Sequence, residues 1–260
     1  MSEEKVIKVM IATPNENFVP WESYENHLDL ASYLGAESAR MKYTGVSPRY
    51  EFFFWSIGRI FTPLARENLC ILALQNNMDY VLMMDNDMLY QRDMFFRLVQ
   101  HQKDIVCPLA FTRRPPHVPV IYIMREGWDT LKHTDFHQHC SVRNYPKNAL
   151  VKCDSAGFGA ALINTRVLKK MPQPWFMGSS GTGEDILFCL NARKYGFQTF
   201  VDTSVKTGHL SDSTVINEES VHESWKKQGF DPQREEAFVK YGYVPLPYET
   251  NGHKEVAHVG

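Results

Sequence analysis

The chain has 260 residues, of which 43% are hydrophobic and 22% are charged. These fractions are typical of a soluble globular protein, and the length suits one large domain or two small ones. Because 28 lysines and arginines face 30 aspartates and glutamates, the formal charge of -2 gives no strong field for nucleic acid or an anionic membrane. A nucleic-acid partner is therefore not expected, and any charged ligand must be held locally.

The cysteine pattern and the N-terminus indicate a cytoplasmic protein. The five cysteines are widely spaced and include no C-x-x-C pair, which favours reduced, mostly buried thiols. The opening MSEEKVIKVMIATPNEN begins acidic and has only a short apolar run, so it predicts neither a signal peptide nor a transmembrane segment. The aromatic stretch EFFFWSIGRIF at 51–61 leaves two alternatives open, burial in a core and peripheral contact with a membrane.

Strand-like and helix-like segments alternate along most of the chain, which is typical of an α/β layer architecture. The helix expected at 62–77 has Thr62 as its N-cap and Pro63 at its first position. The other elements expected in the first half are a strand at 5–13, a helix at 23–41, a strand at 79–85, a helix at 91–102 and strands at 104–111 and 118–124.

The pattern loosens at 125–148, where we expect loops and short strands that shape an acceptor pocket. Regular segments return at 149–171, followed by a helix at 183–197 and a strand at 198–205 that leads to His209. Two further helices are expected, at 217–229 and 231–242. The sequence therefore predicts a domain over 1–215 and a C-terminal helical extension over 216–260 packed on it.

The strand at 79–85 runs directly into two carboxylates, Asp85 and Asp87, separated by Asn86. In open α/β sheets ligands bind beyond the carboxyl ends of the strands, and residues two apart on an extended segment point the same way. A hard divalent cation such as Mg²⁺ or Mn²⁺ would relieve the repulsion and bring substrate phosphates with it. Because a D-x-D triplet also arises by chance, a metal site needs partners elsewhere.

Two later stretches offer such partners. The stretch GTGEDILFC places Glu184 and Asp185 in the first turn of a helix, where the macrodipole favours carboxylates. Ordinary helix capping is the alternative explanation. His209 follows a strand, in the kind of turn from which an imidazole can reach a metal, and a hydrogen-bonded histidine without a ligand is the alternative.

The order of these features resembles the nucleotide-sugar glycosyltransferases of the GT-A fold, especially the large family-two-like group and its small bacterial, phage and viral relatives. The shared features are a first strand, a strand ending in D-x-D within ARENL…DYVLMMDNDM, a GxG strand pair, GED opening a helix, and a strand followed by GH. The resemblance covers about residues 5–210. It implies an α/β, Rossmann-like three-layer sandwich with a mixed central sheet. It also implies Mn²⁺- or Mg²⁺-dependent transfer of a sugar from a UDP- or GDP-sugar to a hydroxyl acceptor on a glycan, protein or lipid, with a glycan favoured.

The resemblance further implies a role for each matching residue. Asp85 would bind the ribose or sugar and join the metal site, Asp87 would bind the metal that bridges the donor phosphates, and His209 would complete its shell. Asp185, supported by Glu184, would be the base of an inverting enzyme, or would position the acceptor in a retaining one. The residues implied at the donor site are Thr13, Pro14, Arg66, Asp85, Asn86, Asp87 and Gly157.

Several features carry two explanations each. Arg113 and Arg114 either clamp a diphosphate or stay solvated, and Arg66 either approaches the nucleotide or forms a structural ion pair. Gly157 and Gly159 either let the backbone approach the donor sugar or mark a bulge without a ligand.

The aromatic residues could pack in a core or contact a ligand, and the histidine cluster could bind zinc. Most of the aromatics at 52–55 and Trp175 are expected in cores, with one or two contacting the acceptor and the loop of Trp175 closing over the donor. The stretch HTDFHQHC at 133–140 lacks the paired spacing of zinc sites, so no zinc is expected there.

Two alternatives to a glycosyltransferase stay open. A sugar nucleotidyltransferase has a related core and uses Mg²⁺, but it carries a glycine-rich, basic loop after the first strand, where this chain reads ATPNENFVP. A non-catalytic sugar- or nucleotide-binding module on the same fold is the second alternative. The nucleotide base, the sugar, the acceptor, the stereochemical outcome and the oligomeric state are not predicted.

Overall fold

The computed structural model describes residues 5–15, 18–124, 139–177, 182–211, 214–231 and 243–245. The strands of the main sheet are β1 (Val6–Asn15), β2 (Arg49–Gly58), β3 (Tyr80–Met84), β4 (Met88–Tyr90), β5 (Ile105–Leu109), β8 (Ala149–Cys153), β10 (Ala160–Asn164), β11 (Thr199–Leu210), β12 (Val215–Ile216) and β13 (Tyr243–Pro245). They follow the order β13-β8-β11-β5-β10-β3-β1-β2, with β4 and β12 paired to β11. Parallel and antiparallel pairs both occur, so the predicted α/β class with a mixed central sheet is confirmed.

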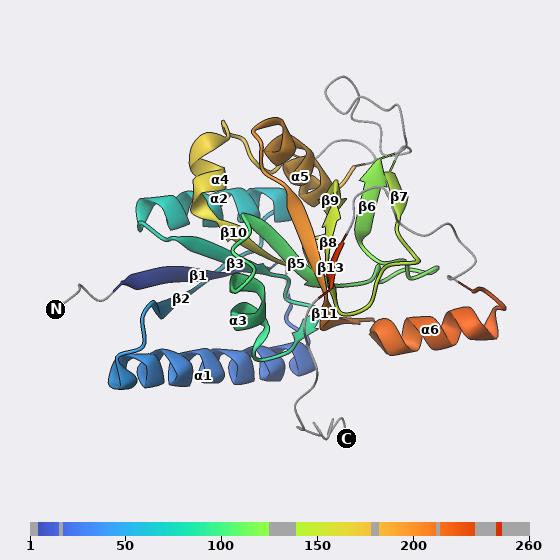
Figure 1. Ribbon diagram of the computed structural model, residues 1–260, viewed down its shortest axis with the longest axis horizontal. Coiled ribbons are helices and arrows are strands. Elements are labelled where there is room, and N and C mark those ends of the chain that lie inside the picture. The colour runs from blue at the N-terminus through green and yellow to red at the C-terminus, as the bar shows by residue number, and fades with distance from the viewer. Residues whose placement is uncertain are drawn as a thin grey trace.

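Helices cover both faces of this sheet (Figure 1). They are α1 (Trp21–Thr44) and α3 (Met94–Val99) on one face, and α2 (Thr62–Gln75), α4 (Thr165–Lys170) and α5 (Glu184–Lys194) on the other. Alternate side chains of a strand point to opposite faces. Accordingly, Val9 and Ile11 of β1 belong to the same buried cluster as Leu34 of α1, whereas Met10 belongs to the cluster of Leu69 of α2. The three-layer sandwich is therefore confirmed.

Strand direction determines which residues meet at one edge of the sheet. Strands β2, β1 and β3 are parallel, β10 runs antiparallel between β3 and β5, and β11 is parallel to β5. The carboxyl ends of β1, β3, β5 and β11 therefore lie at the same edge, where β10 begins. The segments that follow β3 and β5 are consequently brought to the end of β11, which carries His209.

A smaller sheet and the C-terminal segments lie beside the main sheet. Strands β7 (His139–Ser141), β6 (Ile121–Met124) and β9 (Ser155–Ala156) form an antiparallel sheet in that order, so the strand expected at 118–124 is not part of the main sheet. Helix α6 (Glu218–Lys227) confirms the first expected tail helix. The tail also supplies β13, an edge strand paired with β8. The second expected tail helix, at 231–242, lies outside the described residues except for Asp231. The division of the chain at 215 stays a prediction.

Three local expectations need correction or completion. Helix α2 has Phe61 at its N-cap position, so Thr62 is the first helical residue and Pro63 the second. The aromatic stretch forms most of β2, an edge strand of which Phe54 is 51% exposed. Strand β11 extends to Leu210, so His209 lies inside the strand instead of beyond it.

The cysteine prediction is confirmed. All five cysteines are free thiols, and four of them are buried. Burial raises the pKa of the Cys189 thiol to about 12, so it stays protonated. No helix in the described parts of the chain has the length and apolar character needed to span a bilayer.

Candidate functional site

The turn that carries Asp85 and Asp87 is fastened on both sides by backbone hydrogen bonds. The Asp85 amide donates to the Gly159 carbonyl at 3.0 Å, which joins the turn to the start of β10. The Leu210 amide donates to the Asp87 carbonyl at 2.9 Å, which joins it to the end of β11. The Tyr90 hydroxyl lies between two carbonyl acceptors, the nearer one of Gly159 and that of Asp85 at 3.0 Å. The two carboxylates are thus presented by a fixed segment at the carboxyl edge of the sheet.

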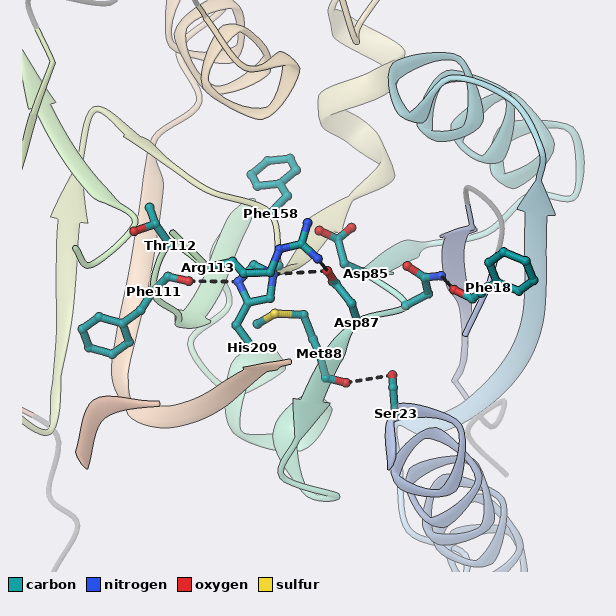
Figure 2. Close-up of polar contacts among 12 residues, drawn as sticks. Phe18, Ser23, Asp85, Asp87, Met88, Phe111, Thr112, Arg113, Phe158 and His209 are labelled. Carbon is teal, nitrogen blue, oxygen red and sulfur yellow. Dashed lines mark hydrogen bonds and ion pairs between the residues drawn. The ribbon is translucent and has the colours of Figure 1, made fainter. Parts of the chain in front are cut away.

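Asp87 and His209 meet at this edge, as Figure 2 shows. The ring Nδ1 of His209 lies 3.0 Å from the Phe111 carbonyl. Because a carbonyl only accepts, Nδ1 carries a proton, and Nε2 faces the Asp87 Oδ2 atom at 3.3 Å. Burial opposes ionisation of Asp87, but the hydrogen bond and charge of His209 lower its pKa overall. The same contact raises the pKa of His209 against the effect of burial.

Arg113 supplies a third partner at this point. Its Nη1 atom lies 3.0 Å from Asp87 Oδ2, and its side chain is 54% exposed (Figure 2). The guanidinium therefore stands as a cation next to the carboxylate, on a side chain that is free to move into solvent.

One oxygen and one nitrogen donor lie together at this edge, a set that fits a divalent cation whose other ligands are water or phosphate. Among the described residues, no three His, Cys, Asp or Glu side chains are grouped as a metal cluster. Mg²⁺ and its relatives need only one or two protein ligands, because water and substrate phosphates complete the shell. Asp87 supplies an oxygen, and His209, once it loses its Nε2 proton, supplies a lone pair beside it. Asp85 has its Oδ1 atom bound to Arg66, and its predicted part in the metal site stays a prediction.

Arg66 of α2 binds two carboxylates from different parts of the chain. Its Nη1 atom lies 2.7 Å from Glu184 Oε1, and its Nη2 atom lies 2.6 Å from Asp85 Oδ1 and 3.2 Å from the Phe158 carbonyl. The side chain is only 3% exposed. Burial acts against its charge, but the neighbouring carboxylates outweigh that effect and raise the pKa of Arg66. The structural ion pair, one of the two explanations predicted for Arg66, is therefore present.

Burial dominates the titration of the two aspartates near Arg66. It raises the pKa of Asp85 to about 6, although Arg66 acts in the opposite direction. It also raises the pKa of Asp185, again against the effect of Arg66 and with a further increase from the negative charge of Glu184. Both carboxylates therefore take up a proton at a pH closer to neutral than an exposed aspartate does.

The Asp185 carboxylate is oriented by backbone donors. Its Oδ2 atom accepts from the Phe158 amide at 3.1 Å, and its Oδ1 atom accepts from the Ile186 amide at 2.7 Å. A Cβ atom at Gly183 would lie 2.5 Å from Asp185 Oδ1, so only glycine leaves room for the carboxylate in this position. Adjacent Glu184 and Asp185 thus have different partners: Glu184 binds Arg66, whereas Asp185 binds backbone amides.

The remaining predicted donor-site residues lie beside the D-x-D turn. The side-chain amide of Asn86 donates to the Asn15 side chain and to the Phe18 carbonyl, both at 2.8 Å. Thr13 and Pro14 directly precede Asn15 on β1. All three therefore occupy the expected edge of the sheet.

The glycines and Trp175 have packing functions in this structure. A Cβ atom at Gly157 would lie 2.8 Å from Val120 Cβ, and one at Gly159 would lie 2.9 Å from Met88 Cε. Each glycine therefore makes room for a neighbouring side chain. Trp175 is 2% exposed and belongs to the core, as expected for most of these aromatics, and closure of its loop over a donor stays a prediction.

An open cavity of about 620 Å³ lies directly beside Asp87 and Arg113. Its walls come from the start of α1, the end of β11 and the start of β12. The lining residues are Pro20, Glu22, Asp87, Arg113, Leu210, Ser211, Thr214 and Val215.

Two residues at the site were not expected from the sequence. Tyr90 holds the D-x-D turn with its hydroxyl, and Phe158 contacts Arg66 and Asp185 through its backbone. Every residue except proline has both a backbone N–H and a backbone C=O. Contacts made through the backbone, like those of Phe158, therefore cannot be predicted from the residue type.

No family model matches this chain, and no curated protein matches it. The solved structures to which it is similar include glycosyltransferases and sugar nucleotidyltransferases. One is A197 from STIV, with 15% identity, a TM-score of 0.48 and coverage of 93% of this chain and 95% of that chain. The catalytic domain of Drosophila beta1,4galactosyltransferase 7, in complex with xylobiose, has 15% identity, a TM-score of 0.38 and coverage of 82% and 71%. GalNAc-T7 with UDP, GalNAc and Mn²⁺ has 11% identity, a TM-score of 0.43 and coverage of 80% and 43%.

Proposed function

We propose that this protein is a metal-dependent glycosyltransferase that moves a sugar from a nucleoside-diphosphate sugar to a hydroxyl acceptor. The observation that carries the proposal is the pairing of Asp87 Oδ2 with His209 Nε2 at 3.3 Å, next to an open cavity of about 620 Å³. An oxygen and a nitrogen donor at the carboxyl edge of the sheet suit a cation shared with a diphosphate. A UDP- or GDP-sugar donor, a glycan acceptor and a cytoplasmic location belong to the same proposal.

In this proposal the residues around Asp87 bind the donor. Asp87 and His209 would hold Mn²⁺ or Mg²⁺, and the bound cation would supply positive charge where the diphosphate departs. Arg113, whose exposed guanidinium now pairs with Asp87, would be within reach to pair with a phosphate oxygen of the donor. Asp85 keeps one oxygen on Arg66 and uses the other to accept a hydrogen bond from a ribose or sugar hydroxyl. Asn86, Thr13 and Pro14 line the nucleoside side of this site, and the backbone at Gly157 borders the sugar.

The acceptor side of the proposal rests on Asp185. A base works best when its pKa approaches the working pH, and burial moves the pKa of Asp185 in that direction. Its two backbone hydrogen bonds fix the carboxylate before the acceptor arrives. Glu184 supports the site through Arg66. In an inverting reaction Asp185 would take the acceptor proton, and in a retaining reaction it would orient the acceptor.

Calorimetric titration of UDP, GDP and CDP, first with Mn²⁺ and then with a chelator, tests the donor site. We expect one nucleotide to bind only with the metal, and Asp87→Asn to abolish that binding. The matched control is Asp29→Asn, on the exposed surface of α1, which should bind normally. Binding that persists with chelator would contradict the proposal.

Assay of transfer separates the two halves of the site. Asp185→Asn should bind nucleotide normally and lose most of its transfer activity. If both Asp87→Asn and Asp185→Asn transferred sugar at the normal rate, the site assignment would be wrong. Formation of a nucleotide sugar from a nucleoside triphosphate and a sugar 1-phosphate would instead identify a nucleotidyltransferase.

A further inference from the structure

A second cavity, of about 540 Å³, lies against α6. It is formed by α6, the turn after it, and the segment that follows β7, and it shares no lining residue with the cavity beside Asp87. In Figure 1, α6 is the orange helix set apart from the helices that cover the sheet. The lining residues are Arg143, Asn144, Tyr145, Lys147, His222, Trp225, Lys226, Gly229, Phe230 and Asp231.

The charges that line this cavity favour an anion. Arg143, Lys147 and Lys226 contribute three cations, whereas Asp231 contributes the only carboxylate among the lining residues. The cavity beside Asp87 differs, because its lining includes two carboxylates and one arginine. A negatively charged ligand is therefore attracted to the α6 cavity directly, without a metal.

The contacts around Tyr145 determine which nitrogen of His222 carries the proton. The Tyr145 hydroxyl donates to Glu218 Oε1 at 2.7 Å, and the other oxygen of Glu218 pairs with Lys206. Burial opposes ionisation of Glu218, but Lys206 and Tyr145 lower its pKa overall, so it is a carboxylate. Since the Tyr145 proton is used, His222 Nε2, 3.2 Å away, must donate to the Tyr145 oxygen.

His222 Nδ1 consequently keeps its lone pair. Burial and the charges of Lys147 and Lys206 lower the pKa of His222 against the effect of Glu218, so the ring is neutral at neutral pH. A neutral ring that is protonated on Nε2 can only accept at Nδ1. A hydroxyl group of a ligand would satisfy this atom.

Four aromatic rings line the cavity, of which Tyr145 and Trp225 are buried and His222 and Phe230 are half-buried. Tyr145 and His222 are stacked with centroids 6.3 Å apart, His222 and Trp225 are 5.4 Å apart, and Trp225 and Phe230 are 5.3 Å apart. Aromatic walls bind the apolar C–H face of a sugar ring, while its hydroxyls reach polar groups. The cavity thus combines an apolar wall, an acceptor for a hydroxyl and an excess of cations.

We propose that the α6 cavity binds a sugar that carries a negatively charged group, either a phosphate or a carboxylate. This site is separate from the proposed nucleotide-sugar site, because the two cavities have no lining residue in common. Failure of the glycosyltransferase proposal would leave it unaffected.

Calorimetry on the full chain tests this proposal with glucose 6-phosphate and glucuronate as probes, and with glucose and inorganic phosphate as controls. We expect at least one anionic sugar to bind more tightly than either control, and the one that binds identifies phosphate or carboxylate as the charged group. Lys226→Glu should weaken that binding roughly tenfold, because it reverses a charge at the cavity. The matched control is Lys227→Glu, an exposed neighbour on the same helix that does not line the cavity.

His222→Phe tests the hydroxyl acceptor separately, since it keeps an aromatic ring and removes Nδ1. It should weaken an anionic sugar severalfold and leave inorganic phosphate unchanged. Absence of binding by both anionic sugars would overturn the proposal, as would equal losses in Lys226→Glu and Lys227→Glu. Phosphate binding as tight as that of the sugars would show that the ring is not recognised and would also overturn it.

Discussion

Replacing Asp85 with asparagine should stabilise the protein at neutral pH, even though the residue belongs to the candidate site. Burial raises the pKa of Asp85 from its ordinary value of 3.8 to about 6, and Arg66 only partly offsets this effect. Since one pKa unit corresponds to about 1.4 kcal/mol, keeping this carboxylate ionised costs the folded state about 3 kcal/mol. Asparagine has the shape of the protonated acid and can still accept a hydrogen bond from Arg66, so Asp85→Asn removes that cost.

The gain from Asp85→Asn should depend on pH with a defined sign. A carboxyl group whose pKa is higher in the folded state binds more protons when folded, so the contribution of Asp85 to wild-type stability falls as pH rises between 3.8 and about 6. Below this window both states are protonated, and the wild type and the variant should be equally stable. Above it the variant should exceed the wild type by the full difference.

Urea unfolding followed by tryptophan fluorescence, with chelator present, measures this difference. The free energies of unfolding should agree at the acidic end of the window and differ by about 3 kcal/mol near pH 8. Asp29→Asn, on the exposed surface of α1, controls for the substitution itself and should have little effect. An Asp85→Asn variant less stable than the wild type near pH 8 would refute the reasoning, because the ion pair with Arg66 would then outweigh burial.

Three further predictions concern the same site. Arg66→Met should lower the free energy of unfolding by about 3–5 kcal/mol in the same urea experiment, because it leaves Asp85 and Glu184 without their cation. Gly183→Ala should reduce transfer in a steady-state assay more than it reduces nucleotide binding, because its Cβ would lie 2.5 Å from Asp185 Oδ1. The affinity for Mn²⁺ in the presence of nucleotide, measured by calorimetry, should rise with pH. The reason is that metal displaces a proton from His209, whose pKa the Asp87 contact raises. Affinity independent of pH would exclude His209 as a ligand.

Most of the sheet could be predicted because its central strands are short and apolar throughout. Strands β3 and β5 are examples, with a polar or charged residue directly before each. Strand β2 was harder, because consecutive aromatics at 52–55 do not alternate, and its edge position leaves Phe54 exposed. The antiparallel insertion of β10 between β3 and β5 depends on packing between distant segments, so local patterns could not predict it.

The sequence predicted which residue types gather at the carboxyl edge better than how they pair. Asp87 and His209 meet as expected, although they are far apart in the chain. Their roles, like that of Asp185, stay predictions. The pairing of Arg66 with both Asp85 and Glu184 depends on how α2 faces α5 across the start of β10, which no single segment encodes.

The hydrogen-bond pattern of the carboxylates distinguishes which of them can act as a base. Asp85 and Glu184 are bound to Arg66, and Asp87 is bound to Arg113 and His209. A carboxylate held in an ion pair would break that pair on taking a proton, so Asp85, although burial raises its pKa, would lose its contact with Arg66. Asp185 instead accepts only backbone N–H groups in the described structure, and burial raises its pKa. Within the proposed function, Asp185 is therefore the one of these four carboxylates that could take the acceptor proton without breaking an ion pair, and this role stays a prediction.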